Sequence, residues 1–183
     1  MPTLLNPPPA LRTVIVMGVS GCGKTSVGRA LAQACGGVFE DADDFHSMAN
    51  KDKMRAGIPL NDDDRWPWFD SLRQRIEQHR TEQPRQIYVL ACSALKAAYR
   101  QRLRSGDGDQ ALRFLHLAGS RELIFSRLSQ RRGHYMPASL LESQLAILEP
   151  SADLLSLDIN GSIEQITAVA AAQLGFQASA KEL

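Results

Sequence analysis

The chain has 183 residues, of which 44% are hydrophobic and 22% charged, and its formal net charge is +1 at pH 7. This length suits one compact domain with a sizeable core, and the near-neutral charge argues against nucleic acid or an anionic membrane as the main partner. The sequence has no run of the roughly 18 apolar residues that a membrane helix needs, and its N-terminus does not have the pattern of a secretory signal, so we expect no membrane partner.

The first twelve residues contain a proline run and predict a flexible lead-in to a domain over residues 13–175, with residues 176–183 as a tail. Residues 13–17, TVIVM, form a β-branched apolar run that predicts a strand buried on both faces. A glycine-rich turn follows, and then a helix that we expect to end at about Cys35, before Gly36 and Gly37.

The glycine-rich turn, GVSGCGKT, matches the phosphate-loop pattern G-x-x-x-x-G-K-[ST] in full. Its backbone N–H groups are expected to cradle the phosphates of ATP, Lys24 to reach the β- and γ-phosphates, and the Thr25 hydroxyl to bind Mg²⁺. A plain flexible turn is the alternative, and the strand before and helix after it favour the phosphate loop. The predicted ATP-binding residues are Gly18, Val19, Ser20, Gly21, Cys22, Gly23, Lys24 and Thr25.

An acidic segment, EDADDFH, follows a second predicted strand at residues 38–40. In a parallel sheet this position lies opposite the phosphate loop, so we expect Asp41 and Asp43 to divide two tasks, holding water on Mg²⁺ and orienting or deprotonating an attacking hydroxyl. A solvated acidic loop is the alternative. His46 fits either a loop histidine or a hydrogen-bonding partner of the substrate.

A second acidic segment, NDDDRWPW, follows a short helix and loop predicted over residues 48–60. Because proline is tolerated in the first turn of a helix, Pro67 predicts a helix over about residues 64–80 with its N-cap near Asp64. That assignment leaves Asp62, Asp63 and Arg65 as candidates for binding a polar substrate.

The remaining pattern alternates strands and helices. Strands are predicted at 87–92, 114–118 and 154–159, and helices at 95–104 and 121–131. Two more helices are predicted from capping signals: one begins at Ser139 with Glu142, and the last begins at Ser162 with Gln165 and ends at Gly175. This alternation predicts an α/β fold, a single doubly wound domain with a five-stranded parallel sheet.

Two predicted helices are basic. Lys96, Arg100 and Arg104 lie at helical spacing on the first, and Arg127 and Arg131 share a face of the second. Near a phosphate loop, such side chains can neutralise charge on a transferred phosphoryl group, often from a mobile lid, although solvated basic faces are the alternative.

The cysteines, Cys22, Cys35 and Cys92, have neither disulfide nor metal-site spacing, so we expect a reducing, cytoplasmic setting. Cys22 lies near a helix N-terminus, where its thiol pKa could be lowered and the thiol become redox-active. The alternative is that it fills space.

Taken in order, MGVSGCGKT, DADDFH, KMRAGIPLNDDDRWPW, CSALKAAYR, RLSQRRGH and LEP resemble the gluconate kinases, a group of P-loop small-molecule kinases, over about residues 13–175. The phosphate loop is widely shared, whereas NDDDR and CSALK are specific. The resemblance implies a P-loop kinase fold with a mobile lid, ATP and Mg²⁺ as cofactors, D-gluconate phosphorylated at its 6-hydroxyl, and a homodimer.

The resemblance also implies residue roles. Asp41 and Asp43 are candidates for the metal-shell and base roles, His46, Arg65 and Lys96 for contacts with the sugar acid, and Arg127 and Arg131 for the lid. Two alternatives stay open at this point: another small-molecule kinase, such as a shikimate or nucleoside monophosphate kinase, and a regulatory module that binds a nucleotide without phosphorylating a small molecule.

Overall fold

The computed structural model describes residues 5–104, 111–130 and 138–178. The strands are β1 Leu5–Asn6, β2 Thr13–Met17, β3 Val38–Asp41, β4 Tyr88–Ala91, β5 Leu112–Ala118, β6 Leu154–Asp158 and β7 Gln177–Ala178. The helices are α1 Lys24–Cys35, α2 Met48–Arg55, α3 Asp62–Glu82, α4 Ala97–Arg104, α5 Arg121–Ser129, α6 Ala138–Ile147 and α7 Ile163–Gln173, with a 3₁₀ turn, η1, at Ala42–Phe45.

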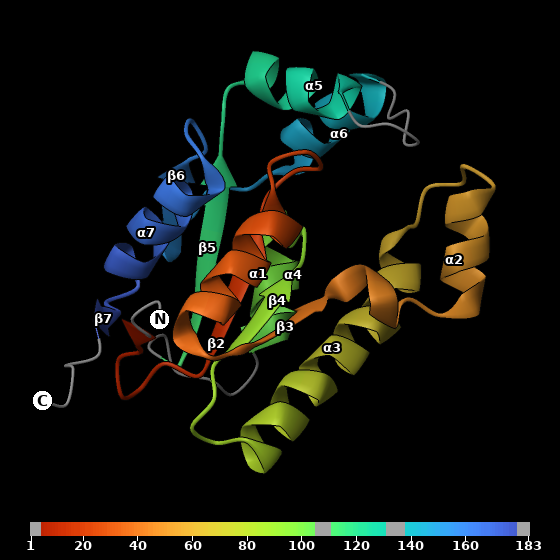
Figure 1. The fold of residues 1–183 in the computed structure, drawn as a ribbon. Helices are drawn as coiled ribbons and strands as arrows, with labels where there is room; N and C mark the ends of the chain where they lie inside the picture. Colours follow the sequence, from red (N-terminus) through yellow and green to blue (C-terminus); the bar gives the residue numbers. More distant parts are fainter. Residues whose placement is uncertain (1–4, 105–110, 131–137, 179–183) are drawn as a thin grey trace, which may run out of the picture.

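Five strands form one parallel sheet in the order β3-β4-β2-β5-β6. The strand that precedes the phosphate loop, β2, is central, and the acidic segment follows β3 at the edge (Figure 1). The prediction of a single α/β domain with a five-stranded parallel sheet is therefore confirmed. The predicted motifs follow the carboxyl ends of these parallel strands, so the topology brings them together at the end of the sheet where such folds bind ligands.

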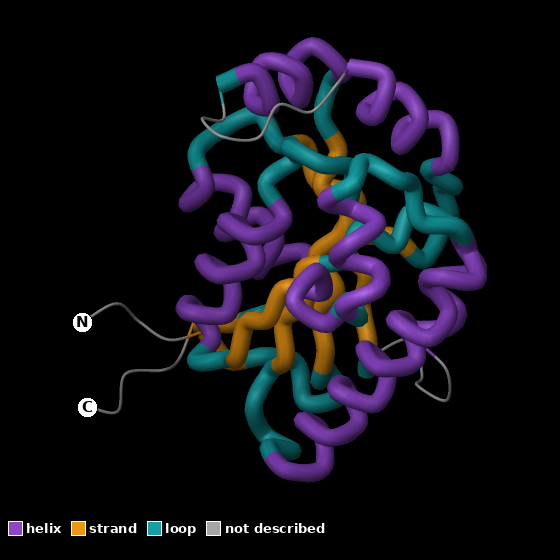
Figure 2. The backbone as a smooth tube through the Cα atoms, turned by 90° about the vertical axis from the view of Figure 1, so that its right-hand side faces the viewer, coloured by secondary structure: helices purple, strands orange, loops and turns teal. Residues whose placement is uncertain are grey.

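Helices cover both faces of the sheet (Figure 2). Side chains of β2 alternate between two apolar clusters: Val14 and Val16 pack with α1 and α7, whereas Ile15 and Met17 pack with α3 and α4. All five residues of β2 are buried, which explains why its sequence is a continuous apolar run.

The start of α3 differs from the prediction. The helix begins at Asp62, with Asn61 as its N-cap, so Pro67 lies inside the helix. Asp64 takes part in the cap as its third residue: its backbone N–H donates to the Asn61 side chain at 2.8 Å, and its carboxylate accepts from the Asn61 N–H at 3.1 Å. The missing N–H of Pro67 leaves the carbonyl of exposed Asp63 without its helical donor, and water can take that place.

Two other boundaries are informative. The prediction that Ser139 caps a helix is wrong, because α6 already begins at Ala138. The capping box of Ser162 and Gln165 is confirmed at the start of α7. Near the two ends of the described chain, β1 pairs with β7 in an antiparallel contact that the sequence pattern did not indicate.

Candidate active site

The phosphate loop joins β2 to α1, and Gly23 precedes the helix with φ 102°. Gly21 has φ 84°, and a Cβ atom built on it would lie 2.6 Å from Cγ of Leu128 in α5. Both positions therefore require glycine for their backbone conformation, and Gly21 also because α5 packs directly on the loop.

A cavity of about 240 Å³ opens over the phosphate loop. Lys24 and Thr25 line it, together with Asp41 and Asp43 from the end of β3 and the start of η1. Nζ of Lys24 donates to the carbonyl oxygens of Gly18 and Val19, at 3.1 Å each. The predicted phosphate-binding residues and the acidic pair thus face the same space.

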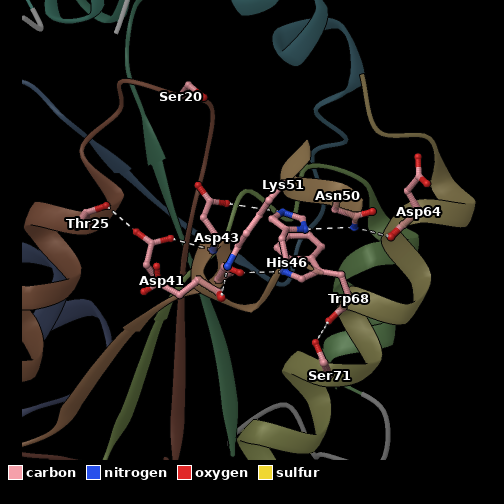
Figure 3. A network of polar contacts seen from close by, with 12 residues as sticks. Ser20, Thr25, Asp41, Asp43, His46, Asn50, Lys51, Asp64, Trp68 and Ser71 are labelled. Atoms are coloured by element: carbon pink, nitrogen blue, oxygen red, sulfur yellow. Dashed lines mark hydrogen bonds and ion pairs between the residues drawn. The ribbon is translucent and has the colours of Figure 1, made fainter. Parts of the chain in front are cut away.

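Asp41 and Asp43 of the acidic segment have different partners (Figure 3). Asp41 accepts a hydrogen bond from the Thr25 hydroxyl at 3.0 Å, while its other oxygen accepts from the Asp43 N–H at 3.2 Å. Glu40 turns away and binds Arg75 and Tyr88. The threonine and Asp41 therefore place hard oxygen atoms side by side, whereas the carboxylate of Asp43 is left to face the cleft.

Asp43 lies where two cavities meet, since it lines both the phosphate cavity and a second cavity of about 440 Å³. The surrounding protein, and then the charge of Asp41, raise the pKa of Asp43. Because 82% of the Asp43 side chain is exposed in the open cleft, water weakens the effect of burial there, while the charge of Asp41 raises the pKa in the open cleft as well. A carboxylate with a raised pKa at this junction has the placement of a general base.

The second cavity, which we call the acceptor cleft, lies between α2, α3, the start of α4 and α6. Its polar lining comes from Ser20, Asp43, His46, Arg65, Ser93, Tyr99 and Gln144, and the rest is largely apolar. Of these lining residues, Arg65 alone carries a fixed positive charge. The cleft therefore offers one cation at one place and a carboxylate, Asp43, at another.

His46 is held rigidly on the wall of the acceptor cleft. Its ring stacks on Trp68, with ring centroids 4.1 Å apart, and its Nδ1 lies 3.4 Å from the Asn50 amide. Nε2 lies 3.9 Å from a carboxylate oxygen of Asp43. Burial, followed by the charges of Lys51 and Arg65, lowers the pKa of His46 to about 4. At neutral pH the ring is therefore an uncharged hydrogen-bonding group.

The lowered pKa of His46 predicts an acid-labile fold. Between pH 6.5 and about 4 the unfolded chain binds this proton and the native state does not, so the free energy of unfolding falls as pH falls through this window. The loss attributable to His46 is at most about 3–4 kcal/mol. Urea unfolding of the wild type and His46→Gln at several pH values measures it: the variant should lack this part of the pH dependence, and equal slopes would contradict it.

The predicted substrate-binding residues separate into two groups. Arg65 lines the acceptor cleft, whereas Lys96 does not and instead donates to both carboxylate oxygens of Asp62, at 3.1 and 3.0 Å. Asp63 is exposed and lines neither cavity. The acidic run thus divides by residue: Asp62 binds cations, Asp64 caps α3 and binds Lys53, and Asp63 faces solvent.

Arg127 belongs to α5 and lies beside the phosphate loop. Its Nη1 lies 4.0 Å from where a Cβ of Gly23 would be, and its Nη2 donates to the Ile159 carbonyl at 2.8 Å. Arg131, the other residue predicted for the lid, lies outside the described residues. Cys22 is fully buried, and burial raises the pKa of its thiol, which is the opposite of the shift a redox-active thiol requires.

The other basic side chains of the 95–104 segment are structural. Arg100 is buried and donates to the carbonyl oxygens of Ala94 and Leu95, and Arg104 pairs with Asp153 at 3.0 Å. By holding the loop after β4, Arg100 supports Ala94, a non-glycine residue with φ 45°. Neither arginine lines the phosphate cavity or the acceptor cleft.

Several residues of the site were not predicted, and three of them make specific contacts. Trp68 supports His46, Tyr99 contacts Arg65, and Gln144 of α6 accepts from the Ser20 N–H at 2.7 Å. Tyr99 could have been suspected, because it follows Lys96 by three residues in a basic segment. No local signal marks Gln144, which reaches Ser20 across 124 positions of sequence.

Comparison with known proteins gives consistent results. A family model described as an AAA domain matches residues 14–151. The chain is 46% identical to a gluconokinase of Gluconobacter oxydans, over 78% of each chain. It is 43% identical to a protein of Dictyostelium discoideum named "Probable gluconokinase", over 84% of this chain and 81% of the relative. A crystal structure of a gluconokinase from Sinorhizobium meliloti superposes with a TM-score of 0.78 at 41% identity, over 89% of this chain and 91% of that chain.

None of the described helices is both long and apolar enough to span a bilayer.

Proposed function

The chain belongs to the gluconokinase family, and on that basis we propose that it transfers the γ-phosphate of ATP to the 6-hydroxyl of D-gluconate, giving 6-phospho-D-gluconate and ADP. The observation that carries this proposal is the position of Asp43 between the phosphate cavity and an acceptor cleft that contains Arg65. Gluconate has a carboxylate at one end and the reacting hydroxyl at the other, which matches one cation and one carboxylate base in a single cleft.

We assign the residue roles from these positions. Asp43 accepts the proton of the 6-hydroxyl as that oxygen attacks the γ-phosphorus and the bond to the leaving ADP breaks. Lys24 stabilises the negative charge on the transferred group, and Arg127 adds positive charge beside Gly23. His46, neutral and fixed on Trp68, is suited to hydrogen-bond a hydroxyl of the acceptor.

Magnesium fits the donor set beside the phosphate loop. The Thr25 hydroxyl and the Asp41 carboxylate are hard oxygen donors in direct contact, 3.0 Å apart. No cluster of three or more His, Cys, Asp or Glu side chains suited to a metal occurs among the described residues, so the ion would depend on phosphate oxygens for much of its coordination. When bound, magnesium would offset phosphate charge; Thr25 would bind it directly and Asp41 through water.

Two further properties are proposed, the first from the family resemblance and the second from the cysteines. A homodimer is expected, and light scattering coupled to size-exclusion chromatography would measure it. A cytoplasmic location is also proposed, and the three unpaired cysteines suit a reducing compartment.

A coupled assay of ADP release tests the choice of acceptor. We expect turnover with D-gluconate and ATP. Turnover with nucleoside monophosphates should be negligible, because their own phosphate would need more cationic groups than Arg65 alone provides in the described lining of the cleft. Turnover with shikimate, which like gluconate has one carboxylate and several hydroxyls, should also be negligible, because the chain matches gluconokinases over most of its length. Brisk turnover of another acceptor beside negligible turnover of gluconate would contradict the proposal. Tight nucleotide binding without any acceptor-dependent turnover would instead favour a regulatory module.

A further inference from the structure

Arg65 does not stand alone in the acceptor cleft, because its guanidinium lies on Tyr99. Nη1 of Arg65 donates to the Tyr99 hydroxyl at 2.9 Å, and the centre of the guanidinium lies 5.7 Å from the centre of the tyrosine ring. Both side chains line the cleft. One residue thus supplies a hydrogen-bond acceptor and an aromatic surface to the cation.

The Tyr99 hydroxyl is also a donor. It donates its proton to Asp62, the carboxylate that pairs with Lys96 at 3.0 Å, and Arg65 lies 3.6 Å from that same carboxylate. With its proton directed to Asp62, the tyrosine oxygen can present only lone pairs to Arg65. Asp62 and Lys96 therefore fix the direction in which the hydroxyl accepts, without lining the cleft themselves.

The tyrosine ring is itself immobilised. Only 4% of Tyr99 is exposed, and its ring stacks on Phe69 with centroids 4.8 Å apart and meets the edge of Trp66 at 5.6 Å. A hydroxyl on so constrained a ring is a fixed point for the long arginine side chain, which would otherwise lose rotamer freedom when it binds an anion.

The charges of this group leave a surplus. Asp62 carries one negative charge against the two positive charges of Lys96 and Arg65, so one positive charge is uncompensated within the group, and Arg65 carries it on the lining of the cleft. We propose that Tyr99 is a positioning residue that, backed by Asp62 and Lys96, aims Arg65 at the carboxylate of the acceptor, an inference that rests on the proposed function. It makes Lys96 an indirect contributor to acceptor binding.

Tyr99→Phe tests this, because it keeps the ring and removes only the hydroxyl. We expect KM for D-gluconate to rise about 3- to 10-fold, less than a lost direct contact to a charged group would cost, with kcat and KM for ATP little changed. An unchanged KM for gluconate in an active variant would overturn the proposal.

Tyr88→Phe is the matched control. Tyr88 also binds a carboxylate, Glu40, that pairs with an arginine, Arg75, but none of these three lines the phosphate cavity or the acceptor cleft. This variant removes a hydroxyl from a chemically similar group, so it reports the general effect on stability. We expect KM for gluconate to be unchanged in it; a rise equal to that of Tyr99→Phe would mean that loss of any such hydroxyl has this effect.

An uncharged acceptor separates positioning from general damage. D-gluconamide keeps the hydroxyls and lacks the carboxylate charge, and its inhibition constant against gluconate can be measured in each variant. We expect Tyr99→Phe to weaken gluconate but not gluconamide, and to have no added effect on gluconate in an Arg65→Ala background. Equal weakening of both ligands, or full additivity with Arg65→Ala, would overturn the proposal. If the wild type turns over another acceptor but not gluconate, the proposed function itself fails.

Discussion

Lys24→Ala is expected to lower kcat by about 10²–10³ while leaving the fold intact. The Lys24 ammonium lines the phosphate cavity and, in the structure, is held by two loop carbonyl oxygens, at Gly18 and Val19. In the role proposed for it, the ammonium group binds the phosphates within this loop and stabilises the negative charge that grows on the transferred group. Steady-state ADP release at saturating ATP and gluconate measures the effect.

Lys51→Ala is a suitable control for Lys24→Ala. Lys51 is a lysine of α2 that donates to the Asp44 carbonyl at 3.0 Å and lines neither the phosphate cavity nor the acceptor cleft. Its loss should change kcat little, and thermal unfolding of both variants checks that the fold is retained. Near-normal turnover by Lys24→Ala would show that the assigned role of the loop lysine is wrong.

Asp43→Asn is expected to lower kcat by about 10²–10⁴, with a much smaller change in KM for ATP, because the amide cannot accept the proton of the hydroxyl. In the wild type, kcat/KM should fall as pH falls through the pKa of Asp43. Since that pKa is raised from its ordinary 3.8, the acid limb should lie above the ordinary aspartate range. Rate measurements across pH, at fixed ionic strength, test both statements.

Asp44→Asn is the matched control for Asp43→Asn, because Asp44 is the next residue, is exposed, and lines neither cavity. It should keep the rate, and its acid limb should move only slightly to lower pH, because the charge of Asp44 is the smallest of the effects that raise the pKa of Asp43. If Asp43→Asn changed only the affinity for ATP, Asp43 would belong to the nucleotide site, and the base would have to be sought elsewhere.

The sheet could be predicted because its strands are short β-branched or apolar runs with turn signals between them, and residues 13–17 are the clearest case. The phosphate loop could be predicted because its function requires glycine at fixed backbone positions. The start of α3 could not, because the penalty for Pro67 inside a helix was overcome by the capping box of Asn61 and Asp64 and by the contacts of Asp62.

Side-chain partners were the least predictable part of the site. The sequence predicts substrate contacts equally for Arg65 and Lys96, yet of the two only Arg65 lines the cleft. Lys96 instead forms an ion pair with Asp62, which lies one turn before Arg65 in α3. Such a choice depends on how α3 and α4 cross, and sequence spacing within either helix carries no information about it. The same holds for Gln144 and Ser20, which meet only because α6 lies over the loop.

The packing of Leu128 against Gly21 also bears on the energetics of the catalytic cycle. Leu128 and Arg127 are neighbours on α5, so the contact that fills the space beside the loop also fixes the arginine's backbone, while the Ile159 carbonyl fixes its guanidinium. The conformational entropy lost in ordering Arg127 is therefore spent once, during folding. In the role proposed for Arg127, this entropy need not be subtracted from the binding energy of each nucleotide that arrives, which leaves more of that energy for the transition state.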